Sequence, residues 1–169
     1  MNISHFNSLD TEQQRQELLA CCQCRGWADA VIADSPFDSF QDLVESAEAH
    51  WAAADEAQVL EAFQGHPQIG DLAALRNKYA STASAEQGQV VEADEAVLIA
   101  LGERNREYLD KFGFIFIVCA TGKSAVEMLG LLEARIGNDR ETELANGAIE
   151  QGKIMRLRLN KRFTEGDGS

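Results

Sequence analysis

Apolar residues recur every three or four positions along most of this chain, which is the spacing of one face of an α-helix. One clear stripe lies in residues 39–53, where Phe40, Leu43, Val44, Ala47 and Trp51 fall on one side. Another lies in residues 139–163. No repeating strand–helix pattern that would build a parallel sheet is visible. The pattern therefore predicts an all-α protein.

Capping residues and glycines set the expected ends of these helices. Asp10 and Asp55 carry side-chain oxygens that can cap a helix start, and Gly65 and Gly113 are placed to close one. No linker separates two cores, and no internal repeat is present. We predict a single domain of about seven or eight helices over residues 1–163, followed by a disordered tail over 164–169.

One stretch departs from the helical pattern. Residues 114–119 are aromatic and β-branched, and they precede Gly122-Lys123-Ser124, which resembles the end of a phosphate-binding loop. That motif needs a glycine five positions before Gly122, where this chain has Ile117. We therefore expect a short, buried extended segment near 114–120 that leads into a helix cap, and no nucleotide site.

The charge balance narrows the choice of partners. The chain has 169 residues with 15 Lys+Arg against 28 Asp+Glu, a net charge of −13. Nucleic acid and anionic membranes both need a cationic surface, so neither is expected as a partner. An anionic substrate would therefore need positively charged side chains gathered at its binding site. Because no signal peptide or membrane-length apolar run is visible, we expect a soluble cytoplasmic protein.

The four cysteines do not form a recognisable metal or disulfide framework. Cys21, Cys22 and Cys24 are too close together for a disulfide framework, no second cluster with His accompanies them to complete a zinc site, and Cys119 is far away in the sequence. We predict reduced, half-buried thiols at a helix end and no metal site.

A candidate for chemistry is the stretch Gly65 to Gly70, where a histidine, a proline and two glycines meet. Proline disfavours helix in the residue before it, so a helix should stop near His66 and leave the imidazole on a stiff corner. The glycines permit turns that other residues resist. Imidazole exchanges protons near neutral pH. A loop histidine with no chemical role is the alternative.

Two further groups could serve the same site. Ser84, Glu86 and Gln87 lie at a predicted helix start, where an acidic residue is also favourable for the helix dipole alone. On the last helix, Arg158 falls at the margin of the apolar stripe and Arg156 lies further toward solvent. An arginine there either needs a partner or an anionic ligand, or extends to solvent from the edge of the core.

Taken together, these motifs resemble the family of 2-oxo-4-hydroxy-4-carboxy-5-ureidoimidazoline (OHCU) decarboxylases, which act between urate and allantoin. The resemblance covers about Leu9 to Phe163 and rests on the order and spacing of several motifs. The family commonly has Arg where this chain has Gln68. The motifs are His66-Pro67-Gln68-Ile69-Gly70, Ser84-Ala85-Glu86-Gln87, residues 105–117, residues 120–124, Arg135-Ile136-Gly137-Asn138 and Leu157-Arg158-Leu159.

The resemblance implies an all-α fold and a cofactor-free decarboxylation that yields (S)-allantoin and carbon dioxide. It implies that His66 transfers a proton and that Glu86 binds N–H groups of the substrate or orients His66. The other residues it implies in substrate binding are Pro67, Ser84, Gln87, Phe116, Ile117, Val118, Cys119, Ala120 and Arg158. A homodimer is compatible with the family.

Two other functions fit the same sequence. An acidic helical protein with an apolar groove could be a non-catalytic interaction module. A different small-molecule lyase could also use the same scaffold and residues. Convergence of His66, Glu86 and Arg158 on one pocket would favour an enzyme over an interaction module.

Overall fold

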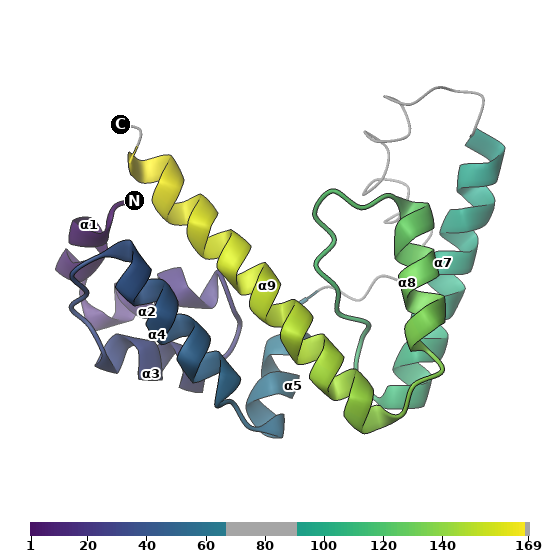
Figure 1. Cartoon of the computed structure of the whole chain (residues 1–169), viewed down its shortest axis with the longest axis horizontal. Helices are drawn as coiled ribbons and strands as arrows, with labels where there is room; N and C mark the ends of the chain where they lie inside the picture. The colour runs from purple at the N-terminus through teal and green to yellow at the C-terminus, as the bar shows by residue number, and fades with distance from the viewer. Residues whose placement is uncertain (67–90, 168–169) are drawn as a thin grey trace. The chain divides into compact units, whose positions relative to one another are not determined.

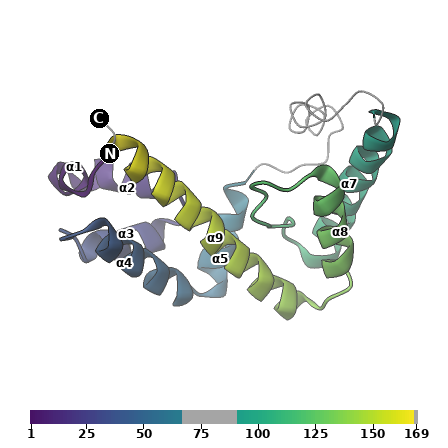
Figure 2. The same ribbon diagram turned by 45° about the horizontal axis from the view of Figure 1, so that its top comes forward.

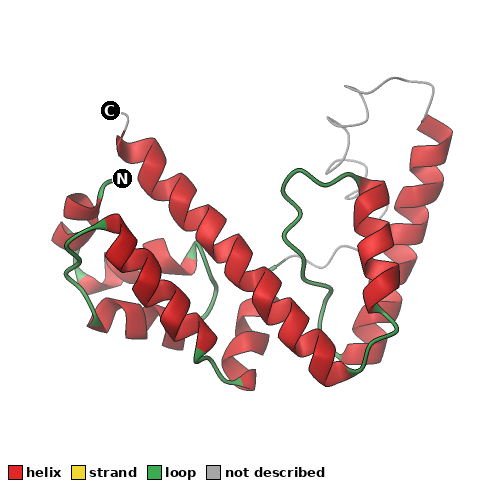
Figure 3. Cartoon of the chain, in the orientation of Figure 1, coloured by secondary structure: helices red, strands yellow, loops and turns green. Residues whose placement is uncertain are grey.

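The structure is a computed structural model that describes residues 1–66 and 91–167, with side chains described for 1–66 and 95–163. The described residues form eight helices and no strands (Figure 3), which confirms the predicted all-α fold. The chain divides into two compact units, one of Met1–His66 with Ala148–Ser169 and one of Pro67–Gly147. The prediction of a single domain is not tested by this division and stays a prediction.

The first unit holds five short helices and most of a long one. They are α1 (Ile3–Ser8), α2 (Thr11–Leu19), α3 (Arg25–Ala33), α4 (Phe40–Ala52), α5 (Glu56–Gln64) and the part of α9 (Arg140–Asp167) that follows Gly147. Figures 1 and 2 show α9 running alongside the shorter helices of this unit. The long helix ends four residues beyond Phe163, the end that we predicted. Disorder of the tail in solution stays a prediction.

Side-chain caps start these helices where the sequence predicts them. Asp10 accepts a hydrogen bond from the Gln13 amide and Asp55 one from the Gln58 amide, and in both cases the glutamine side chain bonds back to the cap residue. This reciprocal arrangement satisfies amide groups that would otherwise lack a partner at the helix start. The cap at Asp55 fixes the start of α5, the helix that leads directly to His66.

The core of the first unit is formed by aromatic and aliphatic side chains from all six helical segments. Trp27 is buried, and its indole N–H donates to the Ala47 carbonyl at 2.9 Å. Trp51 donates to the Ala148 carbonyl at 2.8 Å and packs against Gly152, where an added Cβ would lie 3.1 Å from the indole ring. The Trp27 bond joins α3 to α4, and the Trp51 contacts fix α9 against α4 within this unit.

In the second unit, α7 (Val91–Phe112) and α8 (Ala125–Arg135) pack against each other, and the first residues of α9 follow. Gly113 has a φ of 80°, a conformation that favours glycine, and it ends α7. Residues 115–120 have no regular structure, and Phe114, Phe116, Ile117 and Cys119 are buried. This confirms the predicted buried, non-helical segment, which ends at the Ser124 cap of α8.

Candidate functional site

The helix that we expected to stop near His66 does end there, and the rest of the predicted corner, residues 67–70, lies outside the described residues. Helix α5 ends at Gln64, and the His66 amide donates to the Phe63 carbonyl at 3.2 Å, closing a last turn. The imidazole is partly exposed, and its Nε2 lies 2.6 Å from Oε1 of Gln151 on α9. His66 is therefore held at two points, by the end of its own helix and by a side chain 85 positions later in the chain.

Gly65 serves the end of this helix in a different way from the one we predicted. Its φ is −73°, an ordinary right-handed value that any residue adopts, so no special turn is required. Instead, a Cβ at this position would lie 2.3 Å from the Cβ of Gln23. Glycine is needed because the loop after α2 packs directly on the backbone beside His66.

That loop carries three of the four cysteines. Cys21, Cys22 and Cys24 are completely buried, where we predicted half-buried thiols, and all four cysteines are free. Burial raises the pKa of the Cys21 thiol to about 11, although the nearby Arg162 and Arg158 charges oppose the rise. The thiols therefore stay protonated at neutral pH and act as core side chains.

Arg158 is exposed on α9, and its charge acts on both Cys21 and Cys22. Other arginines on this helix are paired: Arg156 with Glu48 at 3.0 Å and Arg162 with Glu17 at 2.6 Å. Arg158 forms no such pair with any carboxylate in the described ranges 1–66 and 95–163. Among the described residues, Arg156 therefore has a carboxylate partner and Arg158 has none, a contrast that favours Arg158 over Arg156 as a candidate anion ligand.

The extended segment of the second unit is held by cations at two of its carbonyl groups. Arg135 Nη1 donates to the Ile117 carbonyl at 2.8 Å, and Lys123 Nζ donates to the Cys119 carbonyl at 2.9 Å. The Arg135 guanidinium also lies over the Phe116 ring, 4.6 Å from its centre. Lys123 thus holds the backbone of the segment that precedes it, and the expectation that Gly122-Lys123-Ser124 is not a phosphate-binding loop stays a prediction.

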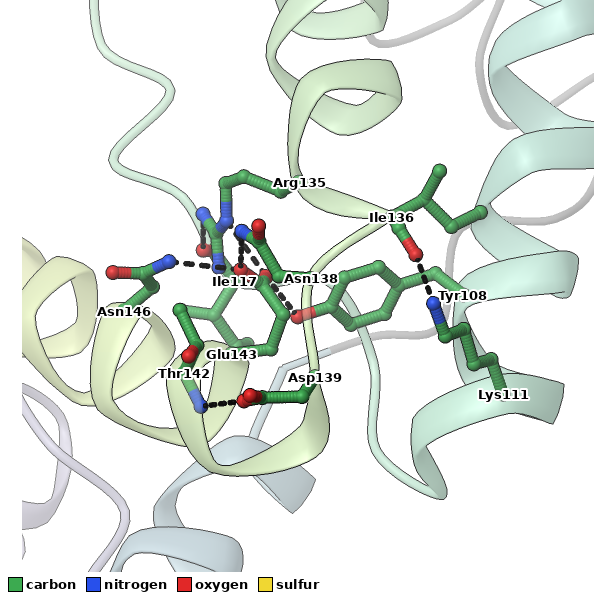
Figure 4. Close-up of polar contacts among 10 residues, drawn as sticks. All are labelled: Tyr108, Lys111, Ile117, Arg135, Ile136, Asn138, Asp139, Thr142, Glu143 and Asn146. Atoms are coloured by element: carbon green, nitrogen blue, oxygen red, sulfur yellow. Dashed lines mark hydrogen bonds and ion pairs between the residues drawn. The ribbon is translucent and has the colours of Figure 1, made fainter.

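A buried carboxylate organises this end of the second unit (Figure 4). Glu143 is fully buried and accepts hydrogen bonds from Tyr108 at 2.6 Å and from Arg135, Asn138 and Asn146 at 2.8 Å each. Burial by itself would raise the pKa of Glu143, but these four hydrogen bonds lower it below the ordinary value. Glu143 is therefore a charged structural centre that fixes Arg135, and through it the Ile117 carbonyl.

The sequence did not point to Gln151 or Glu143, nor to the bonds of Arg135 to Glu143 and to the Ile117 carbonyl. Glu143 and Gln151 are polar residues inside a helix, a pattern that ordinarily indicates a solvent-exposed face. A signal was nevertheless available, because both lie on the line of every fourth residue that contains Met155, Leu159 and Phe163, all buried.

Several predicted site residues lie outside the described part of the chain. These are Pro67, Ser84, Glu86 and Gln87. Of the others, His66 and Arg158 belong to the first unit, and Phe116, Ile117, Val118, Cys119 and Ala120 belong to the second. The convergence of His66, Glu86 and Arg158 on one pocket is thus not tested and stays a prediction.

Two searches of the described residues were negative. Within 1–66 and 95–163 no group of three or more His, Cys, Asp or Glu side chains is placed to hold a metal ion. Among the described helices, none combines the length and apolar character of a membrane span.

Comparison with known proteins gives a consistent result. The family model for OHCU decarboxylase matches residues 7–160. A crystal structure of OHCU decarboxylase in the presence of (S)-allantoin superimposes with a TM-score of 0.71 at 36% identity, covering 88% of this chain and 97% of that one. A structure of (S)-allantoin synthase at 18% identity, with a TM-score of 0.72, supports the fold.

Sequence relatives include longer proteins and proteins of similar length. The uric acid degradation bifunctional protein of Arabidopsis thaliana is 34% identical over 152 residues, which are 88% of this chain and 47% of that protein. The chain likewise spans only 33% of the bifunctional protein of Bacillus subtilis. A 2-oxo-4-hydroxy-4-carboxy-5-ureidoimidazoline decarboxylase from Halalkalicoccus jeotgali is 27% identical over 171 residues, 96% of its length. The chain belongs to the OHCU decarboxylase family.

Proposed function

We propose that this chain decarboxylates 2-oxo-4-hydroxy-4-carboxy-5-ureidoimidazoline to (S)-allantoin and carbon dioxide, in the degradation of urate. Membership of the OHCU decarboxylase family over residues 7–160 supports the reaction. The observation that carries the chemical step is the imidazole of His66, held at the end of α5 by a 2.6 Å hydrogen bond to buried Gln151. A fixed imidazole is the side chain best suited to move one proton at neutral pH.

The reaction itself requires no electron sink from outside the substrate. The bond between the ring carbon and the carboxylate breaks, carbon dioxide leaves, and the electron pair stays on the ring carbon. An adjacent carbonyl or imine of the ring delocalises that pair, and the carbon then takes up a proton. We therefore propose a cofactor-free reaction in which the protein binds the anion, stabilises the developing charge and delivers the proton to one face.

In this proposal Arg158 supplies the positive charge that the composition lacks. It is exposed, and no carboxylate within the described residues neutralises it. A guanidinium can bind a carboxylate through two parallel hydrogen bonds, which suits a carboxylated substrate. The backbone of Phe116–Ala120 would donate N–H groups to ring oxygens, while Glu86, Ser84 and Gln87 would bind the ureido group beside Pro67.

Four free cysteines are compatible with a reducing compartment, and we propose that the protein acts in the cytoplasm. We also propose a homodimer, which light scattering of the purified chain would test. A mass equal to one chain would contradict it.

The function is tested by the handedness of the product. A coupled assay would start from urate, and allantoin would be followed by circular dichroism with and without this chain. Spontaneous decay gives racemic allantoin, so we expect the chain to accelerate formation and to produce one enantiomer. Racemic product formed at the uncatalysed rate would contradict the proposed function.

A further inference from the structure

Gln151 is a polar side chain that no motif singled out and that contacts His66 directly. It is completely buried on α9, and its Oε1 lies 2.6 Å from Nε2 of His66. Its amide nitrogen is also buried and has no hydrogen-bond partner among the described residues. Gln151 is therefore a half-satisfied amide aimed at the residue that we propose transfers the proton.

Packing alone does not account for glutamine at this place. The residues that follow at intervals of four, Met155 and Leu159, are buried and apolar. A leucine at 151 would continue this line and would leave no buried donor unmatched, a cost that proteins normally avoid. What glutamine adds to an apolar side chain is its bond to His66.

We propose that Gln151 is a positioning residue that fixes the tautomer of His66 and thereby selects Nδ1 as the nitrogen that transfers the proton. This inference rests on the proposed function of His66. The amide oxygen can only accept, so the Nε2 atom bonded to it carries a hydrogen. In the neutral ring the lone pair is then on Nδ1.

Counting the protons on His66 through the reaction favours the orientation in which the Gln151 amide oxygen faces Nε2. When His66 is charged, both imidazole nitrogens carry hydrogens. Nδ1 then gives its proton to the substrate carbon that has lost carbon dioxide. The imidazole returns to its neutral form with its hydrogen on Nε2, so the hydrogen bond from Nε2 to Gln151 is kept throughout. With the amide reversed, its NH₂ group would face a second donor whenever the ring is charged, and the bond would have to break.

The tautomer can be measured without any variant. Long-range proton–nitrogen NMR of the full chain labelled with ¹⁵N-histidine distinguishes Nε2–H from Nδ1–H in the neutral ring. There are only three histidines, and single substitutions of His5, His50 and His66 assign them. We expect His66 to be the Nε2–H tautomer. Finding the Nδ1–H tautomer in the wild-type chain would overturn the inference.

Variants then connect the tautomer to turnover. Gln151→Leu should produce a mixture of tautomers and lower kcat by about tenfold or more, with a smaller change in KM, because orientation and protonation of the acid are both lost. Gln151→Glu keeps an acceptor and should keep the Nε2–H signal. Met155→Leu, a volume-conserving change in the same buried line of α9, is the matched control and should alter neither tautomer nor kcat.

Failure of this inference is separable from failure of the proposed function. If Gln151→Leu keeps the wild-type tautomer and kcat, Gln151 does not position His66, whatever His66 does. If His66→Ala turns over at the wild-type rate, the proposed role of His66 is wrong, and the tautomer measurement still reports on the bond to Gln151.

Discussion

Two polar side chains on α9, Glu143 and Gln151, are completely buried, and they are satisfied to different degrees. Glu143 receives four hydrogen bonds, one of them within an ion pair with Arg135. The Gln151 side chain makes one hydrogen bond within the described part of the chain, to His66. A fully satisfied buried group is typical of structural stabilisation, whereas a half-satisfied group beside a histidine is more typical of a functional site.

Glu143→Gln should destabilise the protein by about 3–5 kcal/mol, because it leaves the largely buried charge of Arg135 without its carboxylate. Chemical denaturation at neutral pH would measure this change. Glu48→Gln removes the partner of Arg156 in an exposed pair and should cost about 1 kcal/mol or less, which makes it the matched control. Equal losses in the two variants would contradict a central role for Glu143.

Stability should also depend on pH through Glu143. Burial would raise its pKa, but hydrogen bonds from Asn138, Tyr108, Asn146 and Arg135 bring the pKa below the ordinary value of 4.5. The unfolded chain therefore takes up this proton at a higher pH than the folded chain. The stabilisation is complete above about pH 5 and is lost as the pH falls through the folded value.

Urea denaturation at pH 6, 5 and 4 would measure this effect in the wild type and in Glu143→Gln. We expect the wild type to lose more stability between pH 5 and 4 than the variant, since the variant no longer carries this carboxyl group. Identical pH dependence in the two proteins would show that Glu143 is not held in its charged form.

At the scale of elements, the junction of α5 with the loop after α2 sets the position of His66. Gly65→Ala should destabilise the protein by about 1–3 kcal/mol, because the new methyl group would overlap the Gln23 side chain. It should also lower kcat by displacing His66. Thermal denaturation and turnover measure the two effects.

Gly130→Ala is the control for this substitution. Gly130 lies inside α8, and an added Cβ would meet nothing within 4 Å. The same chemical change there should stabilise the protein by about 0.5–1 kcal/mol, since alanine loses less conformational entropy in a helix than glycine. If Gly65→Ala behaved like Gly130→Ala, close packing of the loop on Gly65 would be wrong.

Many helix starts and ends could be predicted from the sequence, because capping residues and helix-ending glycines act on their immediate neighbours. Asp10 and Asp55 cap their helices, Gly113 ends α7, and residues 115–120 are non-helical, as expected. The packing role of Gly65 could not be predicted, since it depends on Gln23, a residue more than forty positions earlier that no local pattern connects to it.

The polar core of α9 was missed for a related reason. Hydropathy assigns glutamate and glutamine to solvent, and only their partners, Arg135 for Glu143 and His66 for Gln151, make burial favourable. Motif order was sufficient to identify the family but not to identify the groups that position its candidate residues.

At the scale of the whole molecule, a net charge of −13 opposes the binding of an anion. Several cations are already neutralised in ion pairs, such as Arg156 with Glu48 and Arg162 with Glu17. Arg158 lies between these two on α9 and has no such pair in the described ranges. In the proposed function it therefore carries the electrostatic part of substrate binding.

Arg158→Gln should raise KM by about tenfold or more without changing the helix content, because one charge-assisted hydrogen bond to the substrate is worth about 1.5–3 kcal/mol. Steady-state kinetics and far-UV circular dichroism would measure the two quantities. Arg156→Gln, two residues away and already paired in the wild type, is the control and should leave KM nearly unchanged. If the two variants exchanged behaviour, Arg156 would be the substrate ligand.

The central claim is that the imidazole of His66 delivers the proton to one face of the product, and it is tested most directly by the handedness and rate of allantoin formation with His66→Ala. The variant should keep its far-UV spectrum, because His66 lies beyond the last residue of α5. We predict product formation at the uncatalysed rate and racemic allantoin. Single-handed allantoin formed by His66→Ala at close to the wild-type rate would contradict the account.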